Sequence, residues 1–229
     1  VTPSTFSQSP GPYDIVVIAS VYEPIDSSNW DAVNEAVESR RSNAFLFFID
    51  GCSSCSTTQN AQQLVTSINS TAGLSVSLGN NVQQSLQMPL NTASPYASSF
   101  TGLNPFRVGF ITYINGVPRD NALYLAPDSA IPPVDPLLDD VFGLLIPRSE
   151  SYGGNGACIF ATVDMTLFME TNDRQIAPAF IHAATSPDGA CGTPAEVSKS
   201  FSTSQVSQWP AGANSTLLTI TVNNFTDTN

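Results

Sequence analysis

The order of apolar and polar positions predicts a chain built mostly from short strands. Apolar residues recur with a period of two in several segments, most clearly over 157–169, and Gly, Pro, Asn and Ser separate these segments. Residues 43–50 are apolar on both faces and predict a buried central strand. The other predicted strands are 13–22, 74–78, 82–90, 107–114, 122–125, 141–146, 176–183 and 215–225.

Two segments have the helical period instead. Apolar residues recur at helical spacing from Trp30 to Val37, after the polar opening Ser27-Ser28-Asn29, and predict a helix that ends near Arg41. A second helix is predicted over 57–68. Because about ten strands follow one another with few helices between them, we expect a mainly β fold, an antiparallel β-sandwich of jelly-roll type with one or two short helices in loops.

Three parts of the chain are expected. Residues 1–12, rich in Ser and Pro, form an extended tail, residues 13–172 form the sandwich, and residues 173–229 form a C-terminal β extension packed on the same domain. The side chains expected between the two sheets are Leu46, Phe48, Leu74, Val76, Val108, Phe110, Val163, Met165 and Leu167.

Composition and charge narrow the function classes. With 229 residues, 41% of them hydrophobic and 11% charged, the chain can bury a core, and it has no apolar run long enough for a membrane span. The formal charge is −12, and the bases are one lysine and six arginines. This balance argues against a basic nucleic-acid-binding arm or an anionic-membrane partner, whereas a basic ligand or a polyamine remains possible. The expected partners are copies of the same chain or related subunits.

Four cysteines are candidates for disulfides: Cys52, Cys55, Cys158 and Cys191. The pair Cys52 and Cys55 has CxxC spacing, but a zinc site would need a second such pair or more than the single histidine, His182. A redox CxxC, two structural disulfides and four buried thiols stay open, and three pairings are possible.

Three sequons, at Asn69, Asn214 and Asn224, are candidates for N-glycosylation. Together with the even number of cysteines they favour an extracellular setting. Because the sequence begins at Val1, we expect a processed or cleaved form.

Catalytic residues are hard to assign. A serine-hydrolase triad would need His182, which lies in an apolar segment and is expected to be a hydrogen-bonded core or interface residue. Two carboxylates could still meet in a hydrolase cleft. The candidates are Glu23, Asp26, Asp50, Asp164 and Glu170, although Asp50 is expected to cap a turn and Asp164 to face solvent.

The proline-rich segment 127–140 contains four acids and no base. It is expected to be an exposed loop, in which Asp135, Asp139 and Asp140 could bind Ca²⁺ at a subunit contact. Alternatively Arg119 or Arg148 of a neighbouring subunit could compensate these charges, or the acids could simply be solvated. No other cofactor is expected.

The strand order over 43–170 resembles a known family. A strand that closes at Met88-Pro89, a proline and serine loop, the strand 107–114 and the long alternating segment 157–169 are similar to the second half of single jelly-roll coat proteins of small icosahedral RNA viruses. The resemblance implies a non-enzymatic subunit that self-assembles in a virion.

Three functions therefore remain open. The first is the self-assembling structural subunit. The second is a secreted, disulfide-bonded N-glycoprotein that acts as a binding or adhesion module, and the third is a secreted hydrolase that uses two carboxylates.

Overall fold

The structure is a computed structural model, and it describes residues 15–20, 24–39, 44–49, 58–127, 135–163, 173–186 and 188–192. Its elements follow one another as β1 (Ile15–Ser20), α2 (Ser27–Glu38), β2 (Ala44–Ile49), α3 (Thr58–Ala72), β3 (Ser77–Met88), η1 (Ala97–Leu103), β4 (Phe106–Asn115), β5 (Val117–Pro118), β6 (Ala122–Leu125), β7 (Leu137–Leu138), β8 (Val141–Ile146), η2 (Ser151–Gly154), β9 (Cys158–Thr162) and α4 (Asp173–Thr185).

Seven strands form one mixed sheet in the order β1-β2-β9-β8-β4-β3, with β6 paired to β8. The pairings β1–β2 and β2–β9 are parallel, whereas β9–β8, β8–β4 and β4–β3 are antiparallel. A second, two-stranded sheet joins β5 to β7. The described part of the chain is therefore a mixed α/β fold, and strands dominate its centre as the sequence predicts.

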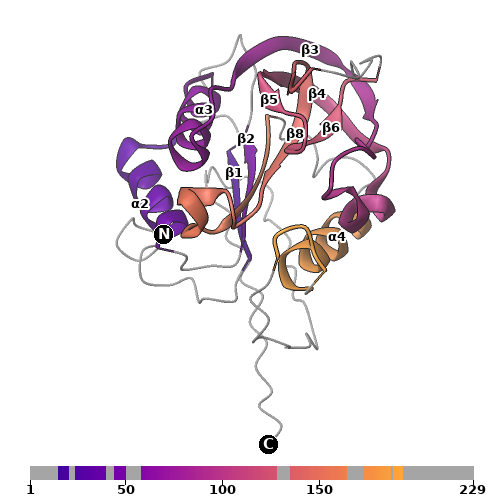
Figure 1. The fold of residues 1–229 in the computed structure, drawn as a ribbon. Helices are drawn as coiled ribbons and strands as arrows, with labels where there is room; N and C mark the ends of the chain where they lie inside the picture. Colours follow the sequence, from indigo (N-terminus) through magenta and orange to yellow (C-terminus); the bar gives the residue numbers. More distant parts are fainter. Residues whose placement is uncertain are drawn as a thin grey trace, which may run out of the picture.

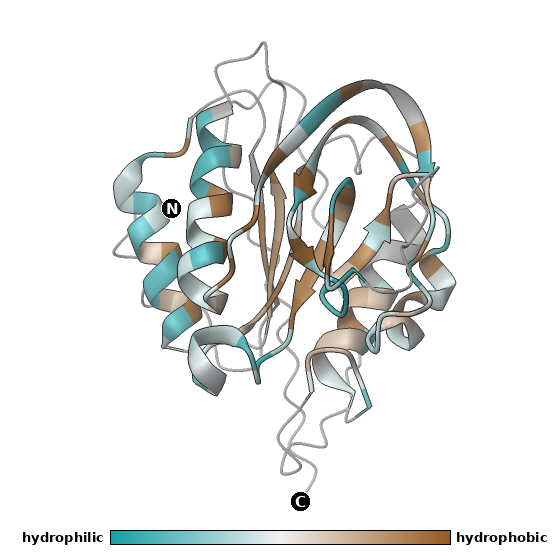
Figure 2. Ribbon diagram, turned by 45° about the horizontal axis from the view of Figure 1, so that its top comes forward, coloured by the Kyte–Doolittle hydropathy of each residue, from teal (hydrophilic) through white to brown (hydrophobic). Residues whose placement is uncertain are grey.

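Helices cover the main sheet, with α2 and α3 on one side and α4 on the other (Figure 1). Trp30 and Val33 of α2 belong to one core cluster together with Phe47 of β2. Phe180 of α4 and Phe48 of β2 belong to the second core cluster. Because side chains alternate along a strand, β2 contributes side chains to two separate cores, one on each face of the sheet. All six residues of β2 are buried, as its apolar run predicts. Figure 2 shows the brown, apolar strands at the centre of the molecule and teal, hydrophilic residues on α2 and α3.

This arrangement differs from the predicted antiparallel sandwich. Parallel neighbours need a crossover connection of about a dozen residues, and α2 supplies it between β1 and β2. The prediction treated this helix as an insertion in a loop, and it was wrong about the direction of β1, β2 and β9 relative to one another. Neither face of the main sheet is covered by a second sheet of comparable size within the described residues.

The prediction for 176–183 is also wrong, since this segment lies within α4 rather than in a strand. A short apolar run does not separate a strand from a buried helix by periodicity. The alanines at 177, 179, 183 and 184 favour the helix. Within the segment 127–140, which was predicted to be a loop, Leu137–Leu138 pairs as β7 with β5, and residues 128–134 lie outside the described residues.

The predicted helices at 30–41 and 57–68 correspond to α2 and α3. Of the nine residues predicted to lie between two sheets, five are buried, but in two clusters on opposite faces of the main sheet: Val76 and Val163 in the first, and Leu46, Phe48 and Val108 in the second. Leu74 is half-buried against the first cluster. The side chains of Phe110, Met165 and Leu167, the predicted tail 1–12 and the predicted strand 215–225 lie outside the described residues.

Candidate functional site

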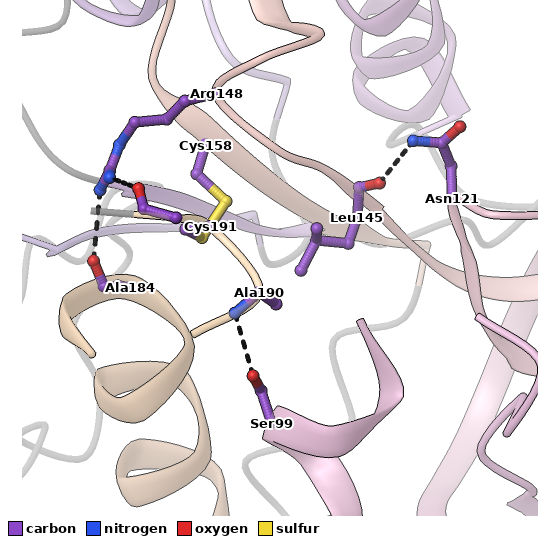
Figure 3. Close-up of a disulfide and its surroundings, with 9 residues drawn as sticks. Ser99, Asn121, Leu145, Arg148, Cys158, Ala184, Ala190 and Cys191 are labelled. Atoms are coloured by element: carbon purple, nitrogen blue, oxygen red, sulfur yellow. Dashed lines mark hydrogen bonds between the residues drawn. A yellow bond between two sulfur atoms is a disulfide. The ribbon is translucent and has the colours of Figure 1, made fainter. Parts of the chain in front are cut away.

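A disulfide fixes the loop after α4 to the main sheet. Cys158, the first residue of β9, is bonded to Cys191, and their Cα atoms are 5.4 Å apart (Figure 3). Both cysteines are buried, at 1% and 5% exposure. The loop closed by this bond includes α4, so the disulfide holds the helix against the second core cluster.

Hydrogen bonds fix the same loop at three more points. The buried guanidinium group of Arg148, just after β8, donates to the carbonyl oxygens of Gly192 and Ala184. The Ala190 N–H donates to Ser99 Oγ of η1 at 2.9 Å, and the Cys191 N–H donates to the Ala183 carbonyl at 2.9 Å. These bonds, two of which Figure 3 shows on Ala184 and Ser99, make the loop a rigid wall.

Gly189 allows this close packing. A Cβ atom at this position would lie 2.5 Å from the His182 carbonyl oxygen and 2.6 Å from the Ala183 carbonyl oxygen. Both obstacles are backbone atoms, so a side chain here would displace the loop from the end of α4.

The loop forms one wall of a cavity of about 490 Å³, which we take as the candidate functional site. The second wall is Pro95, Tyr96 and Ser98 at the beginning of η1, and the third is 147–149, directly after β8. Cavities of this size suit small organic ligands. The walls offer proline rings, a tyrosine, two serine hydroxyls and the carboxylate of Asp188.

Tyr96 is anchored at this cavity by its phenol. Its hydroxyl donates to Glu150 Oε1 at 3.1 Å, and Asn121 Nδ2 donates to Glu150 Oε2 at 2.6 Å. Burial raises the pKa of Tyr96 well above its ordinary value, and the negative charges of Glu150 and Asp120 raise it further. The phenol therefore stays protonated and acts as a hydrogen-bond donor at neutral pH.

Asp188 differs from Tyr96, because no other described residue anchors its side chain. It is exposed at the cavity wall, and its carboxylate has no hydrogen-bond or ion-pair partner among the described residues. The Gly189 N–H, next to it in the chain, donates to the Ser186 carbonyl at 2.9 Å. Asp188 thus offers an exposed carboxylate at the cavity wall.

The four predicted cysteines divide into two pairs. Cys158 and Cys191 form the disulfide of this site, whereas Cys52 and Cys55 lie outside the described residues.

Of the three sequons, only Asn69 lies in the described part of the chain. Its half-buried side chain lies near the end of α3, where Nδ2 donates to the Val76 carbonyl at 3.0 Å and Oδ1 accepts from the Val76 N–H at 2.8 Å. The amide that a glycan would modify thus has a structural role.

The three acidic residues of the predicted calcium site each take part in a hydrogen bond that a backbone N–H donates. Asp139 Oδ1 accepts from the Gly116 N–H at 2.9 Å, and Asp135 Oδ1 accepts from the Leu137 N–H at 3.1 Å. The Asp140 N–H donates to Asn115 Oδ1. Among the described residues, no group of three or more His, Cys, Asp or Glu side chains could hold a metal ion.

The two arginines expected to serve a neighbouring subunit are engaged within their own chain. Arg119 donates through Nε and Nη2 to the Asp135 carbonyl, at 3.1 and 2.8 Å. Arg148 is 6% exposed and holds the disulfide loop.

The predicted carboxylate pair falls largely outside the described residues, which omit Glu23, Asp50, Asp164 and Glu170. Asp26 is exposed and precedes α2. His182 is neither a strand residue nor a core residue: it is exposed on α4, and its Nδ1 lies 2.6 Å from Ser186 Oγ, one helical turn away. The predicted strand position and the predicted core position are wrong, because the segment is helical and His182 is exposed on it, whereas an interface role stays a prediction.

The cavity residues Tyr96, Ser149 and Asp188 were missed by the sequence analysis. One signal could have indicated part of the site, namely the turn sequence Ser-Pro-Asp-Gly at 186–189, two residues before Cys191. No sequence pattern connects this turn to Tyr96, since the two segments meet only through the fold.

Comparisons with protein-family models, with curated proteins and with solved structures found no match. Across the described residues, no helix combines the length and the apolar character that a membrane crossing requires.

Proposed function

We propose that this protein is a secreted, disulfide-bonded N-glycoprotein that acts as a binding module, with the cavity at the disulfide corner as its ligand site. The observation that carries the proposal is the buried Cys158–Cys191 disulfide, whose Cys191 lines the cavity. Structural disulfides persist in oxidising compartments and are rare in reducing ones.

The walls of the cavity support a binding role. Arg148 and Ser99 hold the loop in place from two directions, so that the site exists before a ligand arrives. Pre-formed sites bind more tightly because the free energy of binding does not have to cover the entropy cost of ordering the loop. The hydroxyl groups of Ser98 and Ser149 and the carboxylate of Asp188 can orient a ligand between the proline rings.

Peptide mapping of the purified natural material tests the secretory part of this proposal. Digestion without reduction should release Cys158 and Cys191 in one crosslinked peptide, and the peptides that contain Asn214 or Asn224 should carry glycans. Free thiols at both cysteines together with unmodified sequons would contradict secretion.

A ligand screen tests the binding part. A panel of small sugars, peptides and amines is screened by the shift that each causes in the thermal midpoint of the protein. We expect a ligand whose shift is lost in Ser149→Trp, because this substitution places a bulky side chain on the cavity wall. Ser149 is exposed, so the bulky side chain need not disturb the core. Ligand binding that is unchanged by this substitution would place the ligand site elsewhere.

A self-assembling coat-like subunit is the second candidate, and the edge of the main sheet favours it. β3 is 12 residues long and ends the strand order, so one of its sides faces away from the sheet. An edge strand presents backbone groups with which another chain can pair. A location in the virion is part of this second candidate. Electron microscopy and light scattering of the purified protein should show particles if it is correct, and a monodisperse species near 24.2 kDa if it is not.

A further inference from the structure

The electrostatic character of the cavity indicates what kind of ligand it would hold. Asp188 is the exposed charge on its walls, and this carboxylate lacks a partner in the described part of the chain. Among the described residues no ion pair of this carboxylate would have to break before it could bind a cation.

Further acids surround the Tyr96 wall. Glu150 accepts the Tyr96 hydroxyl hydrogen bond at 3.1 Å. Asp120 lies close by, since Ser94 Oγ, two residues before Tyr96, donates to the Asp120 carbonyl at 2.7 Å. Both carboxylates raise the pKa of Tyr96. Two carboxylates therefore lie near the Tyr96 wall.

One basic residue, Arg148, lines the cavity, and its guanidinium group is bound to backbone carbonyl oxygens. Arg148 is 6% exposed, and its guanidinium donates to the carbonyls of Gly192 and Ala184. Its charge is solvated by the backbone that it holds, whereas the carboxylate of Asp188 is open to solvent.

We propose that the cavity binds a small aliphatic amine of the diamine or polyamine type, with one ammonium group on Asp188 and the alkyl chain between Pro95, Tyr96 and Pro147. An ammonium group forms short, charge-assisted hydrogen bonds to a carboxylate and is attracted to the face of an aromatic ring. Methylene groups gain by contact with proline rings. The net charge of −12 raises the local concentration of such cations near the protein.

This inference rests on the proposed binding role of the same cavity. The test uses the full-length, disulfide-bonded protein and isothermal titration calorimetry with putrescine at 0.15 M salt, with 1,4-butanediol as the uncharged analogue of equal length. One putrescine should bind per chain, and the diol should not bind. Asp188→Asn should weaken putrescine binding about tenfold, as expected when a charge-assisted hydrogen bond is lost.

The matched control is Asp31→Asn. Asp31 is an exposed acid on α2, which covers the opposite face of the sheet (Figure 1). Both variants change the net charge equally, so diffuse attraction of cations changes equally. Putrescine affinity should stay within about twofold in Asp31→Asn. Equal losses in the two variants, or no binding by the wild type, would overturn the amine site.

The failure of this inference is distinguishable from the failure of the proposed function. A neutral ligand that binds in the cavity and is displaced by Ser149→Trp, without any effect of Asp188→Asn, would overturn the amine proposal and leave the binding module intact. Free thiols at Cys158 and Cys191 would overturn the secretory proposal, whatever the result with putrescine.

Discussion

The disulfide between Cys158 and Cys191 ties the start of β9, an interior strand of the main sheet, to the loop that follows α4. The two residues are 33 positions apart, and α4 lies between them. One covalent bond thus joins the helix on one face of the sheet, the sheet itself and a wall of the candidate cavity.

Replacing both cysteines of this pair should lower the stability considerably. Closing a loop of 33 residues reduces the entropy of the unfolded chain, which corresponds to about 4 kcal/mol of stabilisation in the chain-entropy model. We expect Cys158→Ala with Cys191→Ala to lower the free energy of unfolding by 2–4 kcal/mol in urea titrations, roughly the usual range. Each single substitution should have much the same effect, because either one breaks the bond. An unchanged urea midpoint would mean that the bond does not form in the native protein.

The aromatic side chains beneath α4 form a second stabilising group. Phe160 of β9 has its ring centroid 4.5 Å from that of Phe180 and 6.1 Å from that of Phe100. All three are buried. We expect Phe160→Ala to lower the free energy of unfolding by about 3–5 kcal/mol, as when a core aromatic site is emptied.

The control for this substitution is Leu137→Ala. Leu137 is 51% exposed on β7, so its truncation should change the free energy of unfolding by less than about 0.5 kcal/mol. Thermal and urea unfolding of the two variants provide the comparison. Equal effects at the two positions would contradict the packing of Phe160 between the sheet and α4.

The same region shows which features a sequence can predict. The predictions for β2 and α2 agree with the structure, because a run of apolar residues and a helical period can both be recognised within a short stretch of sequence. β2 pairs with β9, more than 100 positions away, and nothing local encodes that choice of partner. The sequence therefore predicted where helices and strands lie along the chain better than it predicted which strands pair with one another.

The candidate cavity illustrates the same limit. The cysteines were recognisable as disulfide candidates, and Cys158 and Cys191 do form a disulfide. Tyr96 and Asp188 gave no such signal, since a tyrosine and a turn aspartate are ordinary surface residues until the fold brings them to one cavity. The apolar run that includes Phe180 was assigned to a strand, so the wall built on α4 could not be predicted.

Tyr124 provides a prediction about alkaline pH. Its side chain is fully buried, and its hydroxyl donates to the Leu103 carbonyl at 2.9 Å. Burial raises the pKa of Tyr124 above the ordinary value of 10.0. A raised folded-state pKa means that the native state holds this proton more tightly than the unfolded state does. The stabilisation is complete below pH 10, near the ordinary pKa, and is lost as the pH rises above it.

Tyr124→Phe should therefore reduce the loss of stability above pH 10, because the group that must ionise is gone. At neutral pH the variant should lose about 1 kcal/mol, the usual net value of a buried hydrogen bond. Urea unfolding at pH 7 and pH 11 measures both effects. A steeper alkaline loss in the variant than in the wild type would contradict the buried, neutral phenol.

Asn69 and Thr71 allow the structural role of a sequon to be separated from its glycosylation. Asn69 holds the Val76 backbone with two hydrogen bonds, whereas Thr71 Oγ1 is buried and has no hydrogen-bond partner in the described part of the chain. Both Asn69→Ala and Thr71→Val abolish the sequon. We expect Asn69→Ala to cost about 1–3 kcal/mol, since the Val76 backbone loses its partners. Thr71→Val should be neutral or stabilising, because it removes an unsatisfied buried hydroxyl at constant shape. Urea unfolding of both variants, with intact mass measurement of the wild type, decides between the two roles. If a glycan on Asn69 were what stabilises the protein, the two variants would lose stability equally and the wild-type mass would include that glycan.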